Sequence, residues 1–173
     1  MVNMNTNSVQ FFSDNPVVPH RGMAELILAA WKISNSENIG KIIRLAHNVG
    51  ATQALFVQGD ENHRLSKIKK TAGFSYNQQN WSFITEKEFE TKYLPNYIVT
   101  ALETCDGATD LYRTELPVKT ILLAGSESHG IPEEILERIN HKVFIAMPGG
   151  CKSMNVSNAL SVAAFEWLRQ TAY

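Results

Sequence analysis

The sequence contains only two cysteines among 173 residues, Cys105 and Cys151, and neither belongs to a Cys-x-x-Cys pair or a Cys/His ligand spacing. This scarcity excludes a disulfide-rich scaffold, argues against structural zinc and favours a reducing, cytoplasmic compartment. The histidines are scattered, at positions 20, 47, 63, 129 and 141. We therefore expect no bound metal.

Long apolar runs are also lacking. The longest, Leu26 to Trp31, is far short of the roughly 18 residues that span a bilayer, so a membrane protein is not expected. The N-terminus has no basic start followed by an apolar block, which predicts no signal peptide. The net charge of −1 indicates that any nucleic-acid binding must use a local basic patch.

The glycine loops of the common nucleotide-binding folds are missing. No Gly-x-Gly-x-x-Gly follows the first expected strand and no Gly-x-x-x-x-Gly-Lys-Ser/Thr occurs, which disfavours Rossmann and P-loop sites. Ser126-x-Ser128-x-Gly130 is close to the nucleophile elbow of hydrolases. Its first glycine is replaced by serine, and His141 is the only histidine beyond the turn, so the hydrolase is a weak alternative.

What is present is an alternation of short apolar runs with helical patterns. Residues 1–22, rich in Asn, Ser and Pro, are expected to form an N-terminal arm or tail, and residues 23–173 a single α/β domain with a mostly parallel sheet. Strands are expected at 24–31, 53–57, 81–84, 97–102, 119–125 and 143–147. Helices are expected at 34–50, 62–73, 86–92, 132–140 and from 153 onward.

The most informative stretch lies near the C-terminus. Val143 to Met147 suits one buried strand, Pro148-Gly149-Gly150 ends it, and Ser153 and Asn155 offer N-cap side chains before a helical pattern. A strand, a glycine loop and a helix start expose unpaired N–H groups that can hold a ligand. An ordinary strand–helix connection is the alternative.

The first long helix is expected to bury one face, with serines and Asn38 as its caps and Gly50 as its stop. Arg44 lies on a polar face near a junction that begins Asn38-x-Gly40, where a ligand backbone could approach closely. The next helix carries the densest basic cluster of the chain, which is either a solvated face or an RNA contact: Arg64, Lys67, Lys69 and Lys70.

Three strand ends bear glycines, within residues 102–107, 125–130 and 147–153. In open α/β sheets, ligands bind outside the carboxyl ends of the strands. We therefore expect these three loops to build one ligand site.

Taken together, three ordered motifs resemble those of the SpoU/TrmH family, the ribose 2′-O RNA methyltransferases of the SPOUT class. The motifs are Asn38-x-Gly40-x-x-x-Arg44-x-x-x-Asn48-x-Gly50, Leu123-Ala-Gly125-x-Glu127-x-x-Gly130-Ile-Pro132, and Ile145-x-Met147 leading to Ser153-Met-Asn155-Val-Ser-Asn158-Ala. The resemblance runs from about Ala24 to the C-terminus. It is greatest to the minimal members that modify the wobble ribose of tRNA.

The resemblance implies a SPOUT (alpha/beta knot) fold with a C-terminal deep trefoil knot. It also implies an obligate homodimer in which both subunits contribute to each active site. The last helix supports a dimer independently, because Val162 and Phe165 flank its main apolar stripe and more than one side needs cover.

The resemblance also implies roles for individual residues. Arg44 would act at the ribose, with Glu127 and Asn38 positioning it, the loops or the RNA. The pocket for S-adenosyl-L-methionine would use Leu102, Gly125, Ile145, Ser153 and Asn155. Ala146 stands where many members have proline, and this chain has its proline one residue after Met147, at Pro148. Phosphates could be held by Arg64, Lys67, Lys69, Lys70 and Lys152.

These parts predict methyl transfer from S-adenosyl-L-methionine to a ribose 2′-OH of RNA, with tRNA preferred. The sulfonium supplies an activated methyl, so the protein must align the 2′-oxygen and help to remove its proton. With a pKa above about 12, Arg44 is a poor base and suits orienting the ribose better, although proton removal by Arg44 stays open. The alternatives are the same reaction on rRNA and a catalytically silent, dimeric RNA-binding module.

Overall fold

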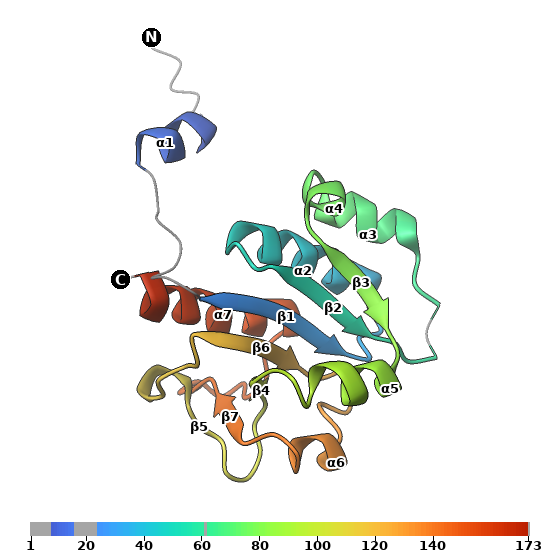
Figure 1. Cartoon of the computed structure of the whole chain (residues 1–173), viewed down its shortest axis with the longest axis vertical. Helices are drawn as coiled ribbons and strands as arrows, with labels where there is room; N and C mark the ends of the chain where they lie inside the picture. The colour runs from blue at the N-terminus through green and yellow to red at the C-terminus, as the bar shows by residue number, and fades with distance from the viewer. Residues whose placement is uncertain (1–7, 16–23, 61, 173) are drawn as a thin grey trace.

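The computed structural model describes residues 8–15, 24–60 and 62–172. A seven-stranded, fully parallel sheet runs through it in the order β3-β2-β1-β6-β4-β7-β5 (Figure 1). The strands are β1 Glu25–Trp31, β2 Gln53–Val57, β3 Trp81–Ile84, β4 Val99–Leu102, β5 Thr109–Asp110, β6 Lys119–Ala124 and β7 His141–Phe144. The helices are α1 Ser8–Asp14, α2 Ser36–Asn48, α3 Leu65–Ala72, α4 Ser75–Gln78, α5 Glu86–Glu88, α6 Glu133–Leu136 and α7 Val156–Ala172. The predicted α/β class is confirmed.

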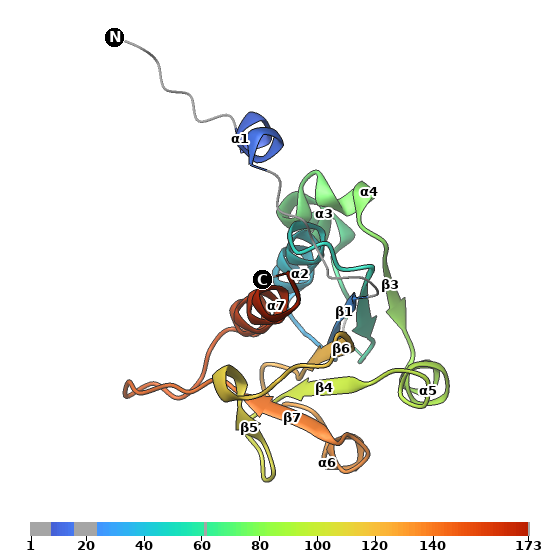
Figure 2. The ribbon, with the colours of Figure 1, turned by 60° about the vertical axis from the view of Figure 1, so that its left-hand side comes forward.

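Helices cover both faces of this sheet. Figure 2 shows α2 and α7 on one face and α5 and α6 on the other. Alternate residues of β1 therefore enter two separate cores: Leu28 packs in the cluster that holds α2 and α7, and Ile27 in the one that holds Phe89 and Ile135. Because both faces are buried, β1 has the continuous apolar run of a central parallel strand.

Helix α2 agrees with the expected pattern except at its cap. Its buried stripe comprises Ile39, Ile42, Ile43, Ala46 and Val49, as predicted. The N-cap, however, is Asn35, whose Oδ1 accepts from the backbone N of Glu37 at 2.8 Å. The expectation that Asn38 caps this helix is wrong, because Asn38 is the third helical residue and turns its buried amide toward a distant loop.

Gly40 serves helix packing rather than a ligand. A Cβ at this position would lie 2.7 Å from the carbonyl oxygen of Ile68 and 2.7 Å from the Cβ of Thr71, both on α3. The backbone that approaches Gly40 thus belongs to α3. The expectation of a close ligand approach at Gly40 is wrong, and the glycine instead seats α3 on α2.

The strand before the last loop lies two residues earlier than expected. We predicted it at 143–147, but β7 spans His141–Phe144, where it pairs with β4 and β5. Past Phe144 the chain leaves the sheet and its apolar side chains turn to a pocket. Other boundaries also shifted: α3 begins at Leu65, β4 at Val99, and α6 ends at Leu136.

Several short elements had no counterpart in the prediction. These are α4, β5 and the 3-10 turn Leu111–Arg113. The helix expected at 86–92 is present as α5 and its π-helical continuation at Phe89–Tyr93. Of the expected arm at 1–22, residues 8–14 form the exposed helix α1, and residues 1–7 and 16–22 lie outside the described ranges. No helix within the described ranges is both long and apolar enough to cross a membrane.

Candidate active site

A pocket lies at the carboxyl ends of β4, β6 and β7, against the start of α7. Its volume is about 590 Å³, within the range of small-molecule sites. All five residues expected to bind the methyl donor line it: Leu102, Gly125, Ile145, Ser153 and Asn155. The three glycine-bearing loops therefore meet at one cavity, as their shared position at the carboxyl ends of parallel strands predicts.

A hydrogen-bond network joins the three motifs beside this pocket. Glu127 Oε1 accepts from Asn38 Nδ2 at 2.8 Å, and Glu127 Oε2 accepts from both the backbone N and the Oγ of Ser34, at 3.1 and 3.2 Å. Asn38 Oδ1 in turn accepts from Asn155 Nδ2 at 3.1 Å. Asn38 is only 2% exposed, so its amide is the buried centre that fixes the β6 loop and the α7 start relative to α2.

Asn155 completes the network by capping α7, as predicted. Its Oδ1 accepts from the backbone N of Ser157 at 3.1 Å and from Ser157 Oγ at 2.6 Å. The oxygen of the Asn155 amide thus caps α7, and its nitrogen donates to Asn38, so both polar atoms of the side chain are hydrogen-bonded. Asn155 is thereby held in one orientation at the pocket wall.

The same network keeps Glu127 ionised. Desolvation raises the pKa of the Glu127 carboxyl, but the hydrogen bonds from Asn38 and Ser34 lower it by more, and the resulting pKa lies below its ordinary value. A carboxylate with a lowered pKa is a weak proton acceptor and a strong hydrogen-bond acceptor. Glu127 therefore suits positioning and charge complementation rather than general base catalysis.

The loop after β6 is closed on itself, which explains its two glycines. Ser126 and Gly130 form an antiparallel bridge, and a Cβ on Gly125 would lie 2.2 Å from the carbonyl carbon of Gly130. Gly130 itself has a positive φ of 67°, and a Cβ there would meet Glu103 Oε2 at 2.6 Å. Gly125 lines the pocket, but its missing side chain is required by Gly130 and not by an approaching ligand.

Glu103 is a pocket residue to which sequence reasoning gave no role. Its Oε2 accepts from the backbone N of Ile131 at 3.1 Å and its Oε1 from the backbone N of Thr104 at 3.0 Å. The side chain thus ties the loop after β4 to the loop after β6. A lone acidic residue directly after a strand gives too little signal to be singled out in advance.

The third loop is closed by Lys152, whose Nζ donates to the carbonyl oxygen of Met147 at 2.7 Å. Lys152 lines the pocket, away from the basic residues of α3 with which it was grouped. Hydrogen bonding with Ser153 lowers the pKa of the exposed Cys151 thiol in the same loop.

Arg44 and the basic cluster lie outside the pocket. Arg44 is exposed on α2, outside the pocket lining, and its side chain makes no ion pair with any described residue. The remaining predicted RNA contacts also stay exposed, either in α3 or directly before it: Arg64, Lys67, Lys69 and Lys70. A single chain thus gathers the expected cofactor residues but not the expected ribose-binding arginine.

The hydrolase alternative fails on topology. Strands β4, β6 and β7 are parallel, so His141, the first residue of β7, lies at their amino ends. Ser126 and Ser128 follow the carboxyl end of β6, across the sheet from that histidine.

Within the described ranges, no group of three or more His, Cys, Asp or Glu side chains could hold a metal ion.

The pocket suits the expected methyl donor in size and in chemistry. Apolar side chains such as Leu102 and Ile145 can cover an adenine ring, and the carboxylates of Glu103 and Glu127 complement a cationic sulfonium or ammonium group. Backbone groups at the open strand ends can read the edge of the base.

Comparison with known proteins places the chain among relatives of this architecture. The tRNA (cytidine(34)-2′-O)-methyltransferase of Yersinia pestis is 30% identical over 146 residues, covering 79% of this chain and 88% of the relative. A solved structure described as giving structural insights into the 2-OH methylation of C/U34 on tRNA matches with a TM-score of 0.74 at 27% identity, over 87% of this chain and 92% of the other.

A larger protein shows the same fold. The AdoMet-bound rRNA methyltransferase of Sinorhizobium meliloti matches with a TM-score of 0.77 at 23% identity, over 87% of this chain but only 58% of its own length. The model of the SpoU rRNA Methylase family matches residues 25–165, a range that contains all three motifs. The predicted resemblance and methyltransferase class are confirmed: the chain belongs to the SpoU rRNA Methylase family.

Proposed function

We propose that this protein transfers a methyl group from S-adenosyl-L-methionine to a ribose 2′-OH of RNA, with tRNA as the substrate. The observation that carries the proposal is the pocket itself, where five residues expected from three separate motifs line one cavity. The preference for tRNA rests on size, because the chain spans 88% of the Yersinia pestis tRNA enzyme and 58% of the Sinorhizobium meliloti rRNA enzyme. A cytoplasmic location stays a prediction from cysteine usage.

The bound donor would supply a sulfonium-activated methyl, and the chain's own residues align and shield it. Leu102, Gly125 and Ile145 line the wall where the adenosine would lie, and Ser153 and Asn155 complete the pocket beside α7. Because Asn155 is fixed by Asn38 and Ser157, its position needs no rearrangement on binding.

Arg44 is proposed to orient the ribose and to stabilise the charge that develops on its 2′-oxygen. Its exposure outside the pocket of its own chain supports the expected homodimer, in which the active site draws on both subunits. Phe165 on α7 is 51% exposed and supports the same assembly, because a packed partner would cover it.

The test uses purified protein, radiolabelled S-adenosylmethionine and unmodified transcripts of tRNA and rRNA. Label should appear in a 2′-O-methyl nucleotide of one tRNA after nuclease digestion. Arg44→Ala should abolish transfer while donor affinity, measured by calorimetry, stays within about twofold. Lys87→Ala, an exposed basic residue of α5 on the opposite face of the sheet, is the control and should keep activity.

Other outcomes are equally informative. Label only in rRNA would replace the tRNA proposal with its rRNA alternative. RNA binding without any labelled product would indicate the catalytically silent module. Loss of donor binding in Arg44→Ala would contradict the proposed role of that residue.

A further inference from the structure

Two stretches of the chain carry basic residues without acidic ones, and the exposed Glu37 and Asp60 border them. Residues 38–59 and 62–80 contain no Asp or Glu, although the whole chain has 17 acidic and 16 basic residues. They do contain six basic residues, all exposed: Lys41, Arg44, Arg64, Lys67, Lys69 and Lys70. We call this region of α2, α3 and α4 the basic surface; its charge is complementary to a polyanion.

An exposed aromatic side chain stands within the basic surface. Phe74, between α3 and α4, is 77% exposed, and its ring centroid lies 5.9 Å from that of His47 on α2 with a tilt of 30° between the rings. His47 is held in place by a hydrogen bond between its Nδ1 and Ser75 Oγ at 3.0 Å. The hydrogen bond therefore fixes the His47 ring, and the Phe74 ring beside it is accessible to solvent.

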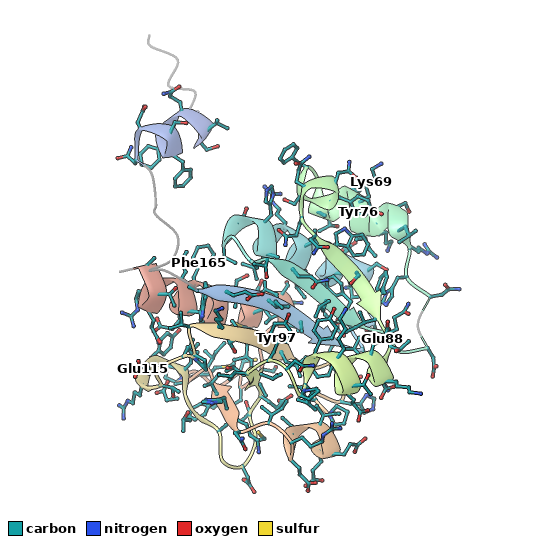
Figure 3. All side chains as sticks on the ribbon, in the orientation of Figure 1. Lys69, Tyr76, Glu88, Tyr97, Glu115 and Phe165 are labelled. Atoms are coloured by element: carbon teal, nitrogen blue, oxygen red, sulfur yellow. The ribbon has the colours of Figure 1, made fainter. Side chains whose placement is uncertain are left out.

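A cation–π pair joins α3 and α4 next to Phe74. Lys69 Nζ sits 5.9 Å from the ring centroid of Tyr76, and Figure 3 shows both side chains together at the α3–α4 corner. Cationic side chains interleaved with aromatic rings are the combination that proteins use for single-stranded nucleic acid.

The basic surface is preformed and stands apart from the pocket. The tight contact at Gly40 locks α3 on α2, so the positions of Phe74 and His47 are set by helix packing. Along α2, nine residues separate Asn38, beside the pocket, from His47, which corresponds to about 13.5 Å at 1.5 Å per residue. A base at Phe74 would therefore lie outside the pocket of the same chain.

We propose that Phe74, backed by His47, is a stacking platform for an unpaired base of the substrate RNA, and that the lysines of α3 hold the flanking phosphates. The proposal rests on the proposed function, since it names how that RNA is held. Unpaired bases of RNA loops can splay out onto aromatic rings, whereas bases within a duplex cannot. The occupant is thus a loop nucleotide of a structured RNA.

The test measures RNA binding and methyl transfer separately on five proteins: wild type, Phe74→Ala, Phe74→Trp, Tyr112→Ala and Lys70→Ala. Tyr112 is 55% exposed in the Leu111–Arg113 turn and serves as the matched control for loss of a surface aromatic. The probe is a fluorescently labelled, unmodified tRNA transcript, with a fully paired RNA duplex as the comparison ligand.

Loss of one stacked base should weaken tRNA binding by roughly 5- to 160-fold in Phe74→Ala. The KM for tRNA should rise by a similar factor, with kcat at saturating tRNA and affinity for S-adenosylmethionine within about twofold of wild type. Phe74→Trp should restore binding, and its added fluorescence should be quenched by tRNA but not by the duplex. Lys70→Ala should reduce the salt slope of binding by about one, whereas Phe74→Ala should leave the slope unchanged.

The outcomes distinguish the stacking platform at Phe74 from the methyltransferase activity on which this proposal rests. If wild type methylates tRNA and Phe74→Ala binds equally well, or Tyr112→Ala binds equally poorly, the platform is refuted and the enzyme stands. If tRNA binding depends on Phe74 but no variant transfers methyl, the platform stands and the activity fails. If wild type does not bind tRNA at all, both proposals are overturned.

Discussion

Replacing Asn38 with aspartate tests the network that joins the three motifs. The variant turns a donor 2.8 Å from Glu127 Oε1 into a second carboxylate. Two carboxylates about 4 Å apart repel by about 1 kcal/mol in water and about 4 kcal/mol near a protein surface. Glu127 is exposed, so we take about 2 kcal/mol, to which the lost hydrogen bond to a charged group adds about 1.5 kcal/mol.

The pH dependence gives this prediction its sign. In the wild type, the pKa of Glu127 is lowered in the fold, so its contribution to stability is present at neutral pH and is lost as the pH falls through that lowered pKa. In Asn38→Asp, the carboxyl pair raises one pKa above its unfolded value of about 4. The stability that this protonated carboxyl contributes is present at acid pH and is lost as the pH rises. The unfolding free energies of the variant and the wild type therefore converge as the pH falls.

Urea unfolding between pH 4 and pH 8 measures the difference. We expect Asn38→Asp to lose about 3.5 kcal/mol at pH 7 and much less at pH 4. Asn158→Asp is the matched control: Asn158 is also the third residue of its helix, α7, but it is exposed. A penalty independent of pH, or an equal penalty in the control, would refute the reasoning.

Two further predictions concern packing and a second carboxylate. Gly40→Ala should destabilise the fold by about 1–2 kcal/mol in urea unfolding, because the added Cβ would overlap α3. Gly149→Ala is the control and should be neutral, because an added Cβ there has nothing within 4 Å. Equal stabilities of the two variants would contradict the packing role of Gly40. Glu166 accepts from Arg169, which lowers the pKa of the Glu166 carboxyl. Glu166→Gln should therefore lower the free energy of unfolding by about 1 kcal/mol at pH 7, and by progressively less as the pH falls through that lowered pKa. A loss of stability that does not change with pH in the same unfolding series would count against the ion pair.

Local sequence determined six of the seven strands, the loops and one cap. The continuous apolar run of β1 required cover on both faces, and glycine-bearing loops after parallel strands had to converge at one edge of the sheet. The N-cap at Asn155 could also be predicted, because a cap involves only neighbouring backbone. These features depend on periodicity and turn chemistry within a few residues, which a single sequence displays directly.

Only the tertiary structure decided what the motif residues touch. Asn38 reaches Glu127 across 89 positions and Asn155 across 117, and neither pairing leaves a periodic trace in the chain. The same is true of Gly40 and Gly125, whose missing side chains make room for α3 and for Gly130. Sequence shows which residues are small or polar, but the partner that makes them necessary is set by packing between distant segments.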